Sequence, residues 1–337
     1  MQALVYTAVR EVELQDHPIP QPKAGEVLLR VEASGVCGSH VDGFLGRSRK
    51  RKPPLVMGHE FTGRLMEDNQ RLGLKAGDSV AVLPLLGCLK CTYCQTGKTN
   101  LCPDRRLIGM DIPGAFADYV IAPERSLYAL PAGVTPKAAT MAEPMANGIH
   151  IRKLIASDRP LPESAFILGA GTIGMVAITA LTDAGCRNIV VTDTNPARLQ
   201  VATRIGATLT VDAKSKNIAQ QVQVTLDNVP LVVDCIGLAA TRALAIDVAD
   251  TSALIVQIGL HDGEMAGEAR DIVTKELTIK GSYGYNAEDF EDALNLIAKQ
   301  NTLFESLVTY EPLSKGQAVF EKLVSDPEAL IKVALTP

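Results

Sequence analysis

The sequence predicts a two-domain α/β protein in which a barrel-like β domain precedes a doubly wound parallel sheet. The chain has 337 residues, which is about two domains by the usual scale. As far as about residue 130, short valine and leucine runs are broken by glycine and proline, a pattern typical of antiparallel β domains. From about residue 164, apolar strands alternate with helical segments, as in parallel α/β sheets.

Each predicted element follows from its local pattern. In the first part, four brief apolar runs, closely punctuated by turn residues, are expected to form strands: 3–6, 26–31, 79–82 and 117–120. In the second part, five apolar runs are typical of buried parallel strands joined by helical crossovers: 165–168, 188–192, 208–211, 231–234 and 253–258. A sixth strand is expected at 277–283, helices near 287–299 and 314–324, and a last strand at 331–335.

The composition excludes several classes of function. The formal net charge is −5 and the pI is about 5.6, so no overall positive field exists to hold nucleic acid or an anionic membrane. No apolar stretch approaches the roughly 18 residues of a membrane span, and nothing near Met1 resembles a signal peptide. We therefore expect a cytoplasmic protein whose partners are small molecules or copies of itself.

A glycine-rich turn follows the strand at 165–168. In it, Gly169 permits a tight turn, Gly171 lets a pyrophosphate approach the backbone, and Gly174 lets helix and strand pack closely. Thr172 and Ile173 open the helix, whose N-terminus favours an anion. The turn predicts a dinucleotide site; the alternative is a glycine turn needed only for packing.

An acidic residue supports the dinucleotide interpretation. Asp193 ends the next strand at about the 20-residue distance expected for a carboxylate that binds the ribose hydroxyls. A carboxylate there would repel a 2′-phosphate, so NAD is favoured over NADP. Asp193 could instead cap the strand end. Arg198 is either a second ribose contact or a solvated helix arginine.

The cysteines indicate a metal-binding lobe. Cys88, Cys91, Cys94 and Cys102 can wrap one Zn²⁺ tetrahedrally, and a closed shell of four thiolates leaves no position for substrate. The site is therefore expected to be structural, the alternative being free or disulfide-paired cysteines. Two further cysteines lie in the apolar α/β pattern and are expected to be buried, inert thiols: Cys186 and Cys235.

A second, open metal site is expected from residues far apart in the sequence. Cys37, His59 with Glu60, and Glu143 offer mixed sulfur, nitrogen and oxygen ligands. Taken singly, Cys37 and His59 would be interpreted as a buried thiol and a hydrogen-bonded core histidine. Dispersed ligands in low number are typical of a catalytic zinc that keeps an open position.

With these motifs in order, the chain resembles the zinc-dependent medium-chain alcohol dehydrogenases, and most of all their polyol branch with sorbitol and galactitol-1-phosphate dehydrogenases. The resemblance covers essentially the whole chain. It rests on the Gly-Val-Cys-Gly-Ser turn at 35–39, Gly58-His59-Glu60, the four-cysteine lobe, Glu143-Pro144, the glycine turn with Asp193, and Gly281-Ser282-Tyr283.

The resemblance implies that Cys37 and His59 ligate a catalytic zinc, with Glu60 and Glu143 as direct or exchanging carboxylates. It implies two zinc ions per chain, NAD as the cofactor, and a homodimer or homotetramer. It also implies a GroES-like catalytic domain at 1–147 with a structural-zinc lobe near 85–105, a Rossmann NAD-binding domain at 148–286, and a C-terminal segment, 287–337, that returns to the catalytic domain.

One segment departs from the family pattern. After Cys-Gly-Ser the family usually carries Asp, an aliphatic residue and then His, whereas this chain has His40, Val41 and Asp42. The family's Asp supports the zinc-bound imidazole, and its His often ends a proton relay to solvent. His40 could therefore form a local hydrogen bond, ligate the metal or act as a packing substitute.

The implied reaction transfers a hydride from a zinc-bound alkoxide to nicotinamide. Ser39, two residues after Cys37, is expected to pass the proton outward, with Asp42 or His40 continuing the relay; the alternative is an ordinary turn hydroxyl. Four aromatic residues are candidates either for the substrate pocket or for the core: Phe44, Phe116, Tyr283 and Tyr285.

The substrate is expected to be a small alcohol, and two classes compete. A neutral polyol is favoured by the resemblance. A phosphorylated or acidic polyol is the alternative, because the basic run at 47–52 lies between two expected zinc ligands and could clamp an anion. Such a run could equally be a solvated loop. A remote alternative is a non-catalytic NAD-binding protein whose fold is stabilised by zinc.

Overall fold

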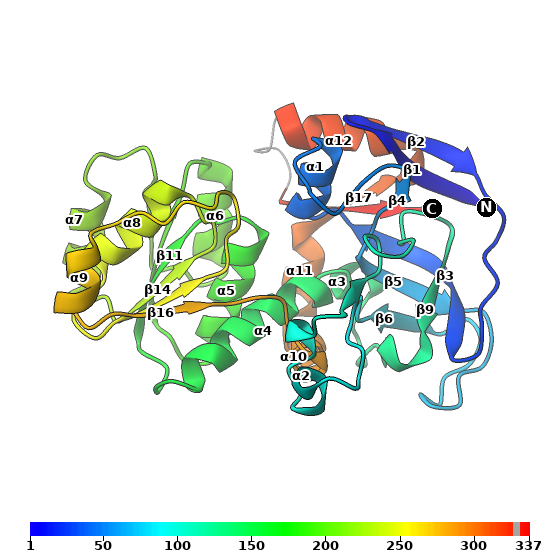
Figure 1. Ribbon diagram of the computed structural model, residues 1–337, viewed down its shortest axis with the longest axis horizontal. Helices are drawn as coiled ribbons and strands as arrows, with labels where there is room; N and C mark the ends of the chain where they lie inside the picture. Colours follow the sequence, from blue (N-terminus) through cyan, green and yellow to red (C-terminus); the bar gives the residue numbers. More distant parts are fainter. Residues whose placement is uncertain (326–330) are drawn as a thin grey trace. The chain divides into compact units, whose positions relative to one another are not determined.

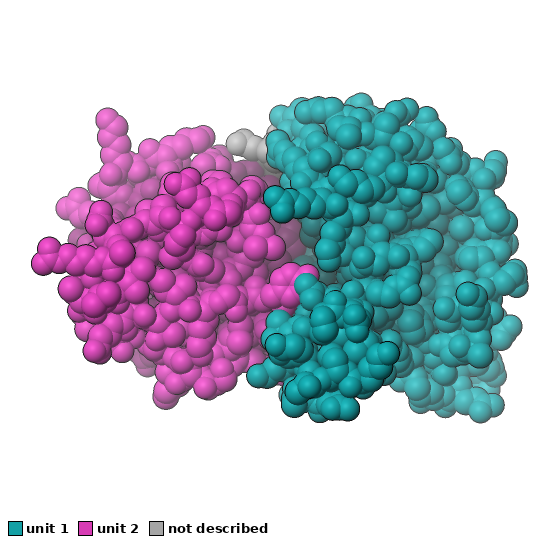
Figure 2. Space-filling model, in the orientation of Figure 1, with its two compact units in different colours: residues 1–146, 285–337 teal, residues 147–284 magenta. Residues whose placement is uncertain are grey.

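The computed structural model describes residues 1–325 and 331–337. The chain divides into two compact units, which are coloured separately in Figure 2. The first unit contains Met1–Ala146 and Tyr285–Pro337, and the second contains Asn147–Gly284. The first unit is therefore assembled from both ends of the chain, with the second unit inserted between them in the sequence.

The largest sheet of the first unit pairs the C-terminal strand with N-terminal ones (Figure 1). Across the sheet the strands are β10 (Leu127–Ala129), β6 (Ser79–Val82), β5 (Glu60–Leu65), β3 (Glu26–Gly35), β18 (Lys332–Thr336) and β17 (Val308–Pro312), and β9 (Tyr119–Pro123) also pairs with β3. Strand β18 runs antiparallel to β3, with Ala334 opposite Gly35. Residues near position 332 are thereby placed beside residues near position 35.

The remaining elements of the first unit are two small sheets, several helices and three 3₁₀ turns. A second sheet has the order β2 (Glu11–Asp16), β1 (Gln2–Ala8) and β4 (Leu55–Val56), and a third joins β7 (Leu85–Leu86) to β8 (Arg106–Leu107). The helices are α1 (Gly38–Phe44), α2 (Thr92–Gln95), α3 (Pro136–Ala139), the start of α4 (Ala142–Ala156), α10 (Ala287–Lys299), α11 (Asn301–Leu307) and α12 (Gly316–Ser325). Three 3₁₀ turns accompany them: η1 (Thr99–Leu101), η2 (Glu124–Ser126) and η3 (Leu313–Lys315).

Aromatic packing holds α1 and α12 together in the first unit. The rings of Phe44 and Phe320 stack with centroids 5.0 Å apart, and Phe116 meets Phe320 edge-on at 6.3 Å. All three side chains are buried in one apolar cluster with Leu4 and Val333. Such aromatic pairs add about 0.5–1.5 kcal/mol beyond the area they bury. Phe44 and Phe116 are therefore core residues.

The second unit is a six-stranded parallel sheet. Its strand order is β13 (Leu209–Asp212), β12 (Asn188–Asp193), β11 (Ser164–Leu168), β14 (Leu231–Asp234), β15 (Leu254–Gln257) and β16 (Thr278–Gly281). The connecting helices are α5 (Thr172–Asp183), α6 (Pro196–Arg204), α7 (Ile218–Leu226), α8 (Ala239–Val248) and α9 (Ala269–Thr274). The order reverses at β11, which is the point where such sheets bind dinucleotides.

The apolar runs explain this sheet. Phe166, Val190, Val232 and Ile255 are wholly buried and belong to one core cluster. Strands buried on both faces carry near-continuous apolar sequence, as expected for parallel sheets between helices. The predicted fold class, a β-rich domain with a doubly wound parallel sheet, is confirmed. Among the described residues, no helix is both long and apolar enough to cross a bilayer.

Several elements were not predicted, among them β2, β5 and α4. Helix α11 and strand β17 occupy positions 301–312, where no element was expected. Most of β17 is solvent-exposed, and it pairs with β18 alone, so its sequence lacks the apolar run of a central strand. The sixth strand of the parallel sheet is also shorter than expected, ending at Gly281.

Candidate active site

The four predicted cysteines converge in the lobe between β7 and β8. Cys91 caps the N-terminus of α2, Cys94 lies within it, and Cys102 ends η1. The four sulfur atoms, including that of Cys88, lie within 4.8 Å of one another, and all are free thiols. Gly87 leaves room for this arrangement, because a Cβ there would come within 2.9 Å of the Cys94 sulfur.

The electrostatics of the lobe suit a metal. Backbone N–H groups of Lys90 and Cys91 lower the pKa of Cys88 to about 6, whereas desolvation raises the pKa of Cys94 to about 12. The close thiols therefore cannot all ionise without a cation among them. Four sulfur donors at this spacing fit one tetrahedral Zn²⁺ and leave it no free position.

A second donor group forms where β3 and β5 run side by side. Glu60 opens β5 and lies directly opposite Gly35 at the end of β3, and Cys37 follows as the N-cap of α1. The strand pairing thus brings Cys37 to His59 and Glu60. Ligand atoms of the three lie within 4.8 Å of one another. One sulfur, one nitrogen and one oxygen donor fit a zinc ion with an open position.

Glu143 lies outside this three-donor group but is coupled to it. The hydroxyl of Tyr285 donates a 2.8 Å hydrogen bond to Oε1 of Glu143. Burial, and then the charge of Glu60, raise the pKa of Glu143 to about 8. Burial and the same carboxylates raise the pKa of Cys37 to about 11. Without a metal, burial and the neighbouring carboxylates therefore favour the neutral forms of Cys37 and Glu143.

Ser39 contacts the expected ligand directly. Its hydroxyl donates to the sulfur of Cys37 at 3.4 Å. Since the serine follows the N-cap of a short helix, the α1 backbone sets this geometry.

His40 adopts the first of its three expected roles. Nδ1 accepts a 2.9 Å hydrogen bond from the Cys37 amide, and the Gly58 amide points at Nε2 from 3.3 Å. The ring is fully buried, 4.2 Å from the ring of His59, and burial holds its pKa well below the usual range. His40 is thus a neutral hydrogen-bond acceptor outside the three-donor group. Asp42 is half-exposed, with Arg47 at 3.9 Å.

The side chains of the basic run at 47–52 differ in their exposure to solvent. Arg47, Arg49, Lys50 and Lys52 are exposed, but Arg51 is only 6% exposed. Nη2 of Arg51 lies 3.5 Å from Nδ1 of His59. The run is therefore a surface loop with one arginine directed into the donor group.

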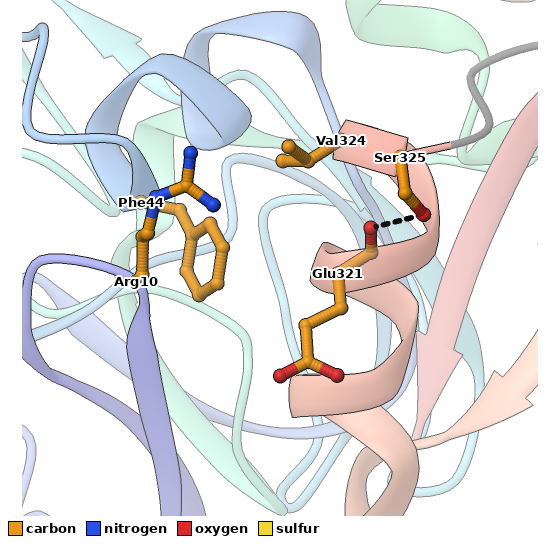
Figure 3. A pocket seen from close by; sticks show the side chains of 5 residues that line it. All are labelled: Arg10, Phe44, Glu321, Val324 and Ser325. Atoms are coloured by element: carbon orange, nitrogen blue, oxygen red, sulfur yellow. Dashed lines mark hydrogen bonds between the residues drawn. The ribbon is translucent and has the colours of Figure 1, made fainter.

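A pocket lined by Phe44, one of the four aromatic candidates, lies apart from the expected zinc ligands. Figure 3 shows Arg10, Phe44 and three residues of α12 around a space of about 280 Å³. No expected metal ligand lines it. Of the other aromatic candidates, Tyr283 is exposed and Tyr285 is buried against Glu143.

The glycine turn of the second unit has the predicted form. Gly169 has a φ of +94°, and a Cβ at Gly174 would collide with the Gly169 carbonyl. Nothing lies within 4 Å of a Cβ built at Gly171, the N-cap of α5. The amides of Thr172 and Ile173 follow in the first turn. This open, positively polarised helix start suits a phosphate.

Asp193 ends β12 beside the turn. Its Oδ2 accepts from the Ala170 amide at 2.8 Å, and its Oδ1 accepts from the Asn195 amide at 2.9 Å. The carboxylate therefore does cap the strand end, and each oxygen keeps a lone pair for another donor. The amide of Arg198 donates to the Asn195 side chain, and Arg198 itself is half-buried.

Comparison with known proteins agrees with this geometry. Residues 23–132 match the alcohol dehydrogenase GroES-like domain, and residues 172–299 match the zinc-binding dehydrogenase domain. A sorbitol dehydrogenase from Halalkalibacterium halodurans is 32% identical, covering 100% of this chain and 99% of its own.

The chain belongs to the zinc-binding alcohol dehydrogenase family.

Two other relatives extend the comparison. A D-arabitol-phosphate dehydrogenase from Enterococcus avium is 29% identical and covers 96% of this chain and 93% of its own. An alcohol dehydrogenase from Escherichia coli CFT073, solved with NADH, is 25% identical with a TM-score of 0.90, covering 100% and 99% of the two chains. The GroES-like and Rossmann folds expected for this dehydrogenase are confirmed, and it is an oxidoreductase that uses zinc and NAD.

Sequence reasoning missed two residues of this dehydrogenase's site. Lys332 is buried and forms an ion pair with Glu60, and any side chain at Gly35 would strike the same carboxylate. The only signal was a lysine at the start of an apolar strand. Arg51 was seen only as part of a charge run. Lys332 depends on the pairing of β18 with β3, and Arg51 depends on the packing of its stem against Gly43 of α1.

Proposed function

We propose that this dehydrogenase oxidises a secondary alcohol of a polyol or sugar alcohol with NAD, using zinc bound by Cys37, His59 and Glu60. The observation that carries the proposal is the set of sulfur, nitrogen and oxygen donors within 4.8 Å of one another. Three protein ligands leave one tetrahedral position open. When bound there, zinc supplies Lewis acidity that makes an alcohol more acidic.

Side chains of this protein would accept the proton of the substrate hydroxyl and pass it to solvent. Ser39, 3.4 Å from the Cys37 sulfur, is the proposed first acceptor of the proton from the substrate hydroxyl. His40 does not extend this path, because backbone amides face both of its ring nitrogens. Asp42 is half-exposed and is the candidate for the outer end of the relay.

Glu143 is proposed as an exchanging carboxylate. It lies outside the three-donor group, and its hydrogen bond from Tyr285 holds one oxygen in place. The second oxygen is then oriented by a fixed side chain. Glu60 is the proposed resident ligand, balanced by Lys332.

We assign the remaining cofactors to the other two sites. The four-cysteine lobe is proposed to hold a structural zinc. The Gly169–Gly174 turn is proposed to hold the pyrophosphate of NAD, with Asp193 on the adenosine ribose and Arg198 beside it. We also propose that the protein is cytoplasmic and that it forms a homodimer or homotetramer. Light scattering of the purified protein would test the oligomeric state.

The polyol assignment is supported by the named relatives, one of which is a sorbitol dehydrogenase. The test is NADH formation at 340 nm against polyols, simple alcohols and amino alcohols, with NAD and NADP compared. His59→Ala should be inactive while remaining folded. If the zinc-replete protein binds NAD but oxidises no member of the panel, the proposed function is wrong. The complete donor set leaves the non-catalytic alternative without support.

A second candidate is an acidic or phosphorylated polyol. The relative from Enterococcus avium acts, by its name, on D-arabitol phosphate. The observation in this chain that favours it is the buried Arg51 beside His59. The same panel should therefore contain sugar-alcohol phosphates and aldonic acids.

A further inference from the structure

Arg51 is a buried cation without a carboxylate partner. Within the described residues, its only side-chain polar contact is that of Nη2 with His59, and no carboxylate oxygen lies within 4.0 Å of its guanidinium. Its Nε is completely buried with no hydrogen-bond partner. An unpaired buried charge is costly, and arginine in such places ordinarily meets an anion.

The local structure holds Arg51 in this position. The Arg51 amide donates to Ser48 Oγ at 3.1 Å, which fixes the backbone. The aliphatic stem crosses helix α1 at Gly43, where a Cβ would come within 2.9 Å of Arg51 Cδ. A glycine on the buried face of α1 therefore makes space for the stem. The inward direction of the side chain is built into the packing.

One end of the guanidinium remains reachable. Nη2 faces His59 and Nε is enclosed, whereas Nη1 has no hydrogen-bond partner among residues 1–325 and 331–337 and is not fully buried. Planar guanidinium groups bind carboxylate and phosphate oxygens through their terminal nitrogens. Nη1 is therefore the atom through which a ligand oxygen would be bound.

Acidic groups act on Arg51 only from a distance. Glu143, Asp111 and Asp42 interact with its charge electrostatically, but among the described residues none forms an ion pair with it. Asp42 carries a half-exposed carboxylate turned towards Arg47. Glu60 is paired with Lys332. The guanidinium of Arg51 thus keeps hydrogen-bond donors that no carboxylate of the described residues occupies.

We propose that Arg51 binds an oxyanion of the substrate, so that this dehydrogenase prefers a polyol bearing a carboxylate or a phosphate. The inference rests on the proposed function and names its substrate class. Arg51 is the substrate-binding residue, whereas the rest of the 47–52 run is surface.

The experiment compares Arg51→Met with Arg49→Met, which removes an exposed charge from the same run. Kinetics are measured with a neutral polyol, its phosphate and its aldonic acid. Losing a charged hydrogen bond should raise KM for an anionic substrate roughly 10- to 100-fold. KM for the neutral polyol should rise far less than KM for the anionic substrates, and Arg49→Met should change neither. The phosphate and carboxylate arms identify which oxyanion is preferred.

Two further measurements separate this role from a purely structural one. Inorganic phosphate should raise the melting temperature of the zinc-loaded wild type, but not of Arg51→Met. Zinc content should be equal in the two proteins. If Arg51 only positions His59, the variant loses zinc or loses turnover of neutral and anionic substrates equally, and the inference is overturned.

The inference and the proposed function can fail separately. Oxidation of neutral polyols in preference to anionic ones, with no effect of phosphate, would overturn the role of Arg51 and leave the proposed function standing. Absence of any polyol oxidation would overturn the proposed function, while phosphate binding that depends on Arg51 would still support the oxyanion site.

Discussion

Tyr285 donates a 2.8 Å hydrogen bond to Glu143 across 142 positions of sequence. Tyr285 is buried and Glu143 is partly buried, and the tyrosine opens the C-terminal part of the first unit. The contact therefore ties the return of the chain to a carboxylate beside the proposed zinc ligands. The hydrogen bond lowers the pKa of that carboxylate, against the larger upward effect of burial. The net upward shift leads to the first prediction.

Metal-free protein should lose stability as the pH rises, and Glu143→Gln should reduce the loss. The folded state raises the pKa of Glu143 from 4.5 to about 8, chiefly through burial. The stability from this group is complete below about pH 4.5 and disappears as the pH rises through about 8. Glutamine keeps an acceptor for Tyr285. The melting temperatures of metal-stripped wild type and Glu143→Gln, measured between pH 5 and 9, should converge at low pH. A constant difference between the two proteins at every pH would contradict the raised pKa of Glu143.

Replacing Cys91 should cost a zinc ion and stability together. A closed four-sulfur site contributes folding free energy, so Cys91→Ser should unfold at lower temperature and bind one zinc per chain in place of two. Thr92→Ser, at the exposed neighbouring position, is the control. In the wild type, a chelator should strip the open site first and abolish activity reversibly. Active wild type with one zinc would be the contrary result.

Asp193 should determine the preference for NAD. Asp193→Asn retains an acceptor for the Ala170 amide but removes the charge. We expect roughly tenfold weaker NAD binding and relaxed discrimination against NADP. Asp212 ends the neighbouring strand opposite Asp193 and is exposed, so Asp212→Asn should change neither. The measurement is cofactor titration by fluorescence, and a wild type that prefers NADP would refute the ribose assignment.

His40→Asp should mimic the loss of Arg51. An aspartate at position 40 can still accept the Cys37 amide, and it adds a negative charge close enough to Arg51 for the two to interact electrostatically. The variant should lose the effect of phosphate on melting temperature, and adding Arg51→Met should cause no further loss, because coupled residues are non-additive. His40→Gln, which adds no charge, is the control. Additive losses in the double variant would argue against the pairing.

Local spacing explains what could be predicted from sequence. The glycine turn, the apolar strands and the four-cysteine lobe each lie within a short segment, so their patterns are visible in the chain. Cys37, His59 and Glu60 were found because three unusual ligand types stood in recognisable turns, and the pairing of β3 with β5 brings them together. The resemblance to a known family supplied the rest of that assignment.

The residues that sequence could not place depend on packing. Arg51 has the same neighbours in sequence as Lys50 and Lys52, and only the space at Gly43 turns it inward. Lys332 acquires its role because β18 pairs with β3. His40 had three open roles, and the amides of Cys37 and Gly58 decide between them. In each case the deciding neighbour belongs to another element.

Strand β18 also sets an order of assembly for the two proposed metal sites. The four cysteines are all present once residue 102 has been made, whereas the cation that balances Glu60 arrives only with Lys332. During synthesis, the structural lobe can therefore load its metal early. The open site can reach its final charge balance only after β18 has joined the sheet, so its loading is coupled to completion of folding.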